Sequence, residues 1–242
     1  MTDSVDNAAF DRARDTVISQ IVEQGGGIGT LGEKTVHKIL KLYYEPRREY
    51  HEVECLGSIA DIMNERGIIE VQTGGLSPLI PKLRRFLPHY PVELVHPVLC
   101  EKRIKWIGAD GAITSSGRRV KSKGIYSCGY ELFKLAPLLN DQNLTVTLLL
   151  LGVDDYRRPR SRGKSSAVDR VPTEIIGSVS LRCVEDYWVF LPNELGKEFT
   201  AEDFEKAIKS RSRYDYYCLR LLCELGLLER ERRGRGYIYR RL

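Results

Sequence analysis

Apolar residues follow two different spacings along the chain, and the changes between them divide it into elements. In the first hundred residues, helical spacing alternates with the two-residue or continuous apolar spacing of strands. The helical segments are 8–24, about 31–44 and 79–87, and the strand segments are 50–55, 59–63, 68–73 and 91–98. Residues 31–98 are therefore predicted to run helix, three strands, helix, strand.

The middle of the chain contains one strongly apolar strand and two polar segments. Leu144 to Val153 is a continuous apolar run, which predicts a strand buried on both faces. Residues 104–113 are typical of a hairpin, and 131–139 of a helix. The basic segments 114–128 and 157–170 are rich in Ser and Gly and predict loops. The second loop is interpreted either as a solvated linker or as a loop over nucleic acid.

A helix-turn-helix pattern followed by a hairpin pattern ends the chain. Thr200 caps a predicted helix over 201–208, and a second helix covers 214–224. Two strands, 227–232 and 237–241, then enclose a turn of arginine and glycine. The phrase ELGLLER…GRGYIYRR is similar to the last helix and wing of bacterial winged-helix regulators.

That resemblance implies DNA recognition, because the second helix of such modules enters the major groove and the wing meets phosphate or the minor groove. The residues implied are Ser212, Arg213, Tyr216, Tyr217 and Arg220 around the second helix, and Arg233 and Arg235 in the wing. The alternative is a winged helix that is used for protein contacts.

Composition narrows the class of protein. The 242 residues carry a formal net charge of +5 and are 42% hydrophobic, which supports a real core. No apolar run is long enough to span a bilayer, and the polar N-terminus is unlike a signal peptide. The six cysteines form no Cys-x-x-Cys pair, which favours free thiols. We expect a cytoplasmic protein without membrane association.

The hairpin predicted at 59–73 carries the candidate chemistry. If its turn at 64–67 closes regularly, Asp61 lies opposite Glu70, and two carboxylates so placed need a cation or a shared proton. Glu70 and Gln72 share one face of the strand, and their oxygen ligands suit Mg²⁺. The following helix, 79–87, carries basic residues. The simpler alternative is a hairpin with polar residues on its solvent face.

These residues resemble the motif of the PD-(D/E)XK nuclease superfamily, which is an Asp, a spacer that crosses a hairpin, then Asp or Glu, any residue, and Lys. Here it reads Asp61, then Glu70-Val71-Gln72, with Gln in place of Lys. The element order over 31–98 is also that of the family's αβββαβ core. Glu33 matches the acid that the family often has on its preceding helix, although a capping box with Thr30 would equally explain it.

The resemblance implies phosphodiester hydrolysis that depends on Mg²⁺ or Mn²⁺. Asp61, Glu70 and the carbonyl of Val71 would hold the metal, with Glu33 assisting, and Gln72 would orient the attacking water. The metal would lower the pKa of that water and offset charge on the phosphate.

We therefore expect an α/β protein with a restriction-endonuclease-like αβββαβ core, a mixed sheet flanked by helices, and a small winged helix-turn-helix domain. The expected domains are 1–160 (nuclease-like), 161–182 (connecting segment) and 183–242 (winged helix). The expected function is a DNA endonuclease of restriction, repair or defence type, with DNA as partner and a homodimer left open. The alternatives are a catalytically inactive DNA-binding regulator and, less favoured, an interaction scaffold without a nucleic acid partner.

Overall fold

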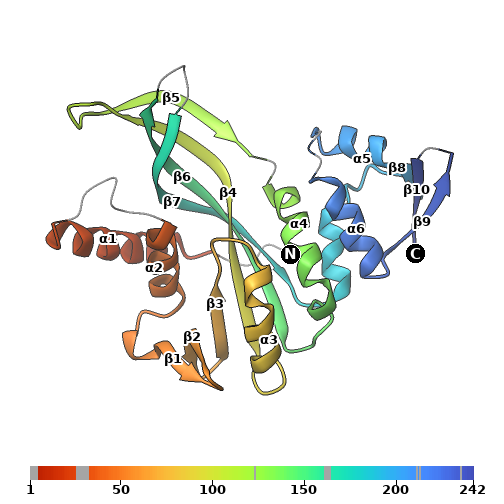
Figure 1. Cartoon of the computed structure of the whole chain (residues 1–242), viewed down its shortest axis with the longest axis horizontal. Helices are drawn as coiled ribbons and strands as arrows, with labels where there is room; N and C mark the ends of the chain where they lie inside the picture. Colours follow the sequence, from red (N-terminus) through yellow and green to blue (C-terminus); the bar gives the residue numbers. More distant parts are fainter. Residues whose placement is uncertain are drawn as a thin grey trace.

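Seven strands form one mixed sheet that organises most of the molecule (Figure 1). They are β1 (His51–Cys55), β2 (Ser58–Asn64), β3 (Gly67–Val71), β4 (Val92–Ile107), β5 (Ile113–Lys121), β6 (Leu144–Pro159) and β7 (Ser165–Leu181). Their order is β1-β2-β3-β4-β6-β7, with β5 paired to β4. The computed structural model describes residues 5–25, 33–122, 124–160, 165–210, 212, 214–234 and 236–242, with the backbone alone at 33, 34 and 118.

Helices cover both faces of this sheet. They are α1 (Asn7–Glu23), α2 (Glu33–Tyr44), α3 (Ile80–Phe86) and α4 (Gly129–Leu135), with short 3₁₀ turns η1 (Arg48–Tyr50), η2 (Ser77–Leu79), η3 (Gly124–Cys128), η4 (Ala136–Leu138) and η6 (Val184–Phe190). The predicted order helix, three strands, helix, strand over 31–98 is confirmed by α2, β1, β2, β3, α3 and β4.

The alternation of β3 shows how one strand serves two apolar layers. Ile68 belongs to the core beneath α3 and α4, whereas Ile69 and Val71 belong to the core beneath α1 and α2. β3 pairs antiparallel with β2 and parallel with β4. The predicted register of the hairpin is confirmed, since Ile62 lies opposite Ile69 and Met63 opposite Ile68.

Two segments that we expected to be loops are strands. Residues 113–121 form β5, and the 157–170 segment belongs to the ends of β6 and β7 around residues outside the described ranges. Residues 165–181, which we assigned above to a connecting segment, are likewise a strand, namely β7 of the large sheet. These strands run past the helices into solvent (Figure 1), so their side chains can be polar while their backbone groups stay paired in the ladder.

The C-terminal elements agree with the predicted pattern. They are β8 (Glu198–Thr200), α5 (Ala201–Ala207), α6 (Tyr216–Glu224), β9 (Leu228–Arg233) and β10 (Gly236–Arg241), with sheet order β8-β10-β9. Thr200 caps α5 as predicted, because its hydroxyl accepts from the backbone N–H of Asp203 at 3.2 Å.

The C-terminal elements share their core with the large sheet. Cys218, Leu221 and Leu222 of α6 belong to the same apolar cluster as Leu132 and Leu135 of α4. The two helices approach closely at Gly129, where an added Cβ would lie 2.9 Å from the backbone N of Cys218. A side chain other than hydrogen therefore cannot fit at this crossing without moving α6.

Gly129→Ala should therefore lower the free energy of unfolding by about 1–3 kcal/mol, because the added methyl group would push the backbones of α4 and α6 apart. Urea unfolding measures it. The matched control is Gly177→Ala in β7, where the nearest atom to an added Cβ is a Leu150 methyl at 3.8 Å. Equal stability of the two variants would contradict the tight α4–α6 contact.

Candidate active site

Two carboxylates meet where β2 and β3 end their pairing. The backbone N–H of Asp61 donates to Glu70 Oε1 at 3.2 Å, and the backbone N–H of Val71 donates to Asp61 Oδ2 at 2.9 Å. Glu70 is only 1% exposed, and the side chain of Asp61 is 20% exposed. The predicted juxtaposition of Asp61 and Glu70 is therefore present, with Asp61 nearer to solvent.

Each carboxylate has its own basic partner, supplied from opposite faces of the sheet. Nζ of Lys82, on α3, lies 2.6 Å from Glu70 Oε2. Nε2 of His37, on α2, lies 3.1 Å from Asp61 Oδ2. The sequence left open either a cation or a shared proton here, and it did not identify Lys82 as the cation. The available signal was the basic helix directly after the hairpin.

The two acids respond differently to their surroundings. Burial raises the pKa of Glu70, the nearby Asp61 raises it further, and the ion pair with Lys82 only partly opposes this. Burial also acts to raise the pKa of Asp61, but the bonds from His37 and the Val71 N–H outweigh it, so this pKa lies below its ordinary value. The cost of placing two carboxylates together therefore falls on Glu70.

Gln72 holds the chain that follows β3. Its side-chain Nε2 donates to the carbonyl of Gly75 at 2.8 Å, and its own carbonyl accepts from Nδ1 of the buried His96 at 2.7 Å. Burial lowers the pKa of His96, which favours a neutral ring with its proton on Nδ1. Glu131 of α4 fixes the same loop, since its Oε2 accepts from the backbone N–H of Leu76 at 2.8 Å.

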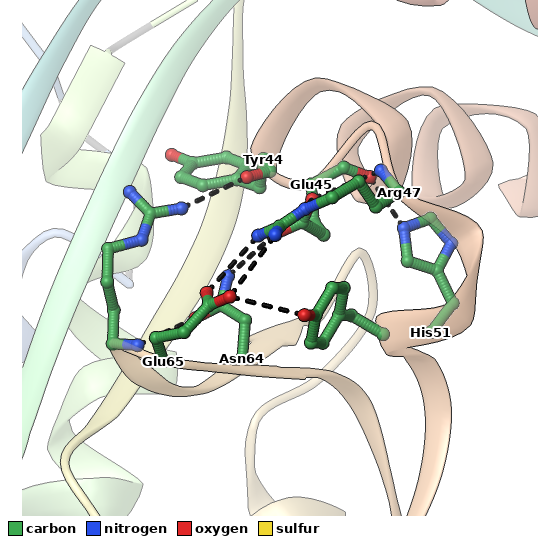
Figure 2. A network of polar contacts seen from close by, with 8 residues as sticks. Tyr44, Glu45, Arg47, His51, Asn64 and Glu65 are labelled. Carbon is green, nitrogen blue, oxygen red and sulfur yellow. Dashed lines mark hydrogen bonds and ion pairs between the residues drawn. The ribbon is translucent and has the colours of Figure 1, made fainter.

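A polar network anchors α2, and with it His37, to the β2–β3 turn (Figure 2). The buried Glu45 follows α2 and accepts from Arg47 Nε at 2.9 Å and from Asn64 Nδ2 at 2.9 Å. Arg47 also bonds Glu65 in the turn at 3.1 Å. The bonds from Arg47 hold the pKa of Glu45 at about 2, so the network is charged at neutral pH.

The predicted metal ligands are only partly described. Glu33 begins α2, but its side chain lies outside the described residues, as does Thr30. Within the part of the chain that the structure describes, no group of three or more His, Cys, Asp and Glu side chains is arranged to hold a metal ion. Asp61 and Glu70 are thus a pair of acidic oxygen donors, to which a backbone carbonyl such as that of Val71 could add.

The predicted DNA-contacting residues that the structure describes differ in their exposure and contacts. The ring of Tyr217 lies 4.7 Å from that of Tyr130 and 5.5 Å from that of Phe133, both on α4. The guanidinium of Arg220 lies 4.4 Å from the Phe133 ring. These contacts turn part of α6 toward α4, which sequence spacing could not reveal.

The remaining predicted DNA contacts lie near the start of α6 and in the β9–β10 hairpin. Tyr216 packs beside Tyr217, with ring centroids 5.2 Å apart, and Ser212 is half-buried with its N–H on Asp215. Arg233 is exposed at the end of β9. Arg213 and Arg235 lie outside the described residues.

The lowered pKa of Asp61 predicts a pH-dependent stability. Asp61→Asn should lower stability by about 1–2 kcal/mol at pH 7, because the ionised form accepts the His37 and Val71 bonds. The difference should be present above the unfolded value of about 3.9 and fade as pH falls through the lower folded value. Melting curves from pH 7 to 2.5 measure it, with the exposed Asp15→Asn as control. A pH-independent difference would contradict this assignment.

Comparison with known proteins gives a family but no described activity. Residues 34–182 match the family model described as "Domain of unknown function (DUF8091)". The chain is also 32% identical over 222 residues to an "Uncharacterized protein" of Treponema pallidum (strain Nichols), which covers 88% of this chain and 87% of that protein. No solved structure matches. In the described ranges no helix is long and apolar enough to cross a membrane. The chain belongs to the family described as Domain of unknown function (DUF8091).

Proposed function

We propose that this protein is a metal-dependent DNA endonuclease whose active site is the Asp61–Glu70 pair with Lys82. The observation that carries the proposal is the ion pair of 2.6 Å between Lys82 and a carboxylate that is 1% exposed. Largely buried acids whose pKa values are shifted in opposite directions, beside a specific cation, are more typical of functional sites than of solvent faces. The pair also occupies the positions that the nuclease motif assigns to acids.

Lys82 supplies what the motif of this chain lacks. The motif's third position is Gln72, which is neutral and whose amide donor is used on Gly75. Lys82, on α3, pairs with the carboxylate of Glu70, two positions before Gln72, and carries a positive charge. We assign to it the stabilisation of negative charge that develops on the cleaved phosphate. Gln72 then has an indirect role, because it holds the loop that follows β3.

The donor set suits Mg²⁺ or Mn²⁺. Mg²⁺ is commonly bound by one or two carboxylates together with waters and substrate phosphates, so a third acidic ligand is not required. Asp61, Glu70 and the Val71 carbonyl would hold the ion, which would acidify water and offset phosphate charge. The described bonds of Asp61 use Oδ2, from His37 and the Val71 N–H. His37 and that N–H orient the carboxylate that would meet the ion.

The C-terminal elements support DNA as the partner. Their order, strand, two helices and a hairpin, with sheet order β8-β10-β9, is the arrangement expected of a winged helix. Because Tyr217 and Arg220 pack toward α4, we place the DNA contacts at Ser212 and Tyr216 before and at the start of α6, and at Arg233 in the hairpin. Arg213 and Arg235 remain predicted contacts from sequence.

The metal site predicts a melting temperature that depends on divalent ions. Mg²⁺ or Mn²⁺ at ten times its Kd should stabilise the wild type by about 1.4 kcal/mol, by mass action on the native state. Glu70→Gln and Asp61→Asn should remove this rise and cleavage of duplex DNA together. The control is Glu54→Gln on the neighbouring strand β1. If the melting temperature of the wild type does not rise with the ion and the wild type does not cleave DNA, the result favours a non-catalytic DNA-binding regulator instead.

The assigned role of Lys82 predicts a large loss of rate. Lys82→Ala should lower the cleavage rate about 10²–10³-fold, as removal of a transition-state donor does elsewhere. Arg84→Ala, on the exposed side of the same helix, should cleave like the wild type. Since Lys82→Ala also leaves Glu70 buried without its partner, melting curves accompany the assay. Lys82→Arg separates the effect on rate from the effect on stability, because it keeps a positive charge beside Glu70. Cleavage by Lys82→Ala at the wild-type rate would contradict the role.

A further inference from the structure

A second cluster of charged residues lies on β4, β6 and β7, away from the Asp61–Glu70 pair. Asp155 on β6 lies opposite Ile104 of β4 and Arg170 of β7. Lys102 is two positions before Ile104, and Arg157 is two positions after Asp155. Since strand side chains alternate, Lys102, Asp155, Arg157 and Arg170 lie on one face of the sheet.

Asp155 is the buried anchor of this cluster. It is fully buried, and its Oδ2 accepts from Arg157 Nη2 at 2.7 Å and Nε at 3.0 Å. Nε of Arg170 lies 3.7 Å from Oδ1, which is longer than a hydrogen bond. Both guanidiniums stay partly open to solvent, with 31% and 44% of the side chains exposed. One buried carboxylate therefore orients two arginines without using all of their donors.

Lys102 adds a third cation that no carboxylate in the described chain pairs with directly. Burial lowers the pKa of Lys102, repulsion from Arg170 and Arg157 lowers it further, and Asp155 only partly opposes this. Asp169 accepts from the Arg170 backbone N–H at 2.7 Å, but it lies opposite Tyr156 and therefore on the other face of the sheet from Asp155. Three cations around the Asp155 carboxylate leave a net positive charge on this face, which is a setting for an anion.

A cavity lies beside Arg170 of this cluster. It has a volume of about 200 Å³, and Arg170 and Asp169 line one part of it. Val36, Thr73 and Pro97 line another part. Each of these three is next in sequence to a residue of the site, namely His37, Gln72 and His96. The cavity is thus close along the chain to residues of the site, and its described lining does not include Asp61, Glu70 or Lys82.

We propose that Lys102, Arg157 and Arg170 bind a phosphate of the DNA strand, and that the cavity takes part of the nucleotide next to it. The proposal rests on the proposed function, because it identifies a substrate-binding subsite for the same reaction. Asp155 acts as a positioning residue that holds the two guanidiniums toward the phosphate. The phosphate could be an internal phosphodiester or the 5′-phosphate at a strand end, which share this chemistry.

Lys102→Ala tests the subsite, with binding to a duplex oligonucleotide measured in Ca²⁺ across a range of salt. Affinity should fall about tenfold, the value of one charge-assisted contact, and the slope of log K against log salt should flatten by about 0.9. Lys102→Arg should retain affinity. The matched control is Arg103→Ala, the next residue of β4 on the opposite face, which pairs with Asp154 at 2.9 Å and should bind like the wild type.

Duplexes with and without 5′-phosphates identify the source of the phosphate. A Lys102→Ala loss on both duplexes supports an internal phosphodiester, and a loss confined to the phosphorylated duplex supports a strand end. Equal affinity of Lys102→Ala and Arg103→Ala on both duplexes, in preparations whose wild type cleaves DNA with Mg²⁺, overturns the subsite alone. A wild type that neither binds nor cleaves either duplex overturns the proposed function.

Discussion

A carboxylate that is almost completely buried beside a second carboxylate is the constraint on which the rest of the candidate site depends. Glu70 cannot be ionised there without a cation, and Lys82 on α3 supplies one. Asp61 is hydrogen-bonded to His37 on α2, from the other face of the sheet. One hairpin thus draws together the helical layers on its two sides. The bonds of Glu45 and Arg47 to Asn64 and Glu65 attach the end of α2 to the turn of the same hairpin.

The sequence predicted the local half of this arrangement. The turn and the two-residue alternation determine that Ile62 meets Ile69, so they also bring Asp61 to Glu70. The Thr200 cap was equally local, since all of its bonds lie within three residues. The pairing of Lys82 with Glu70 was not predictable in this way, because it depends on how α3 packs against the sheet.

Two other features depend on tertiary structure and were missed for that reason. Residues 113–121 and 165–170 are polar enough to resemble loops, but they are strands of a sheet that extends beyond its covering helices. The packing of Tyr217 on Tyr130 joins residues 87 positions apart in sequence. The spacing of apolar residues along α6 identifies its apolar face. It could not show that α4 also packs against the neighbouring aromatic residue Tyr217 and against Arg220.

Helix α4 connects the C-terminal elements to the candidate site. One side of it receives α6 at Gly129, and its Glu131 holds the loop after β3 through Leu76. α4 thus contacts both α6 and the loop that follows β3.

We propose that the paired acids are a metal site rather than a structural ion pair. A crystal grown with Mn²⁺ and a non-cleavable duplex, measured at the Mn absorption edge, tests it most directly. We expect an anomalous peak from Mn²⁺ that is bound by Asp61, Glu70 and the Val71 carbonyl. Glu70 still paired to Lys82, with no peak beside it, would show instead that the acids form a structural ion pair.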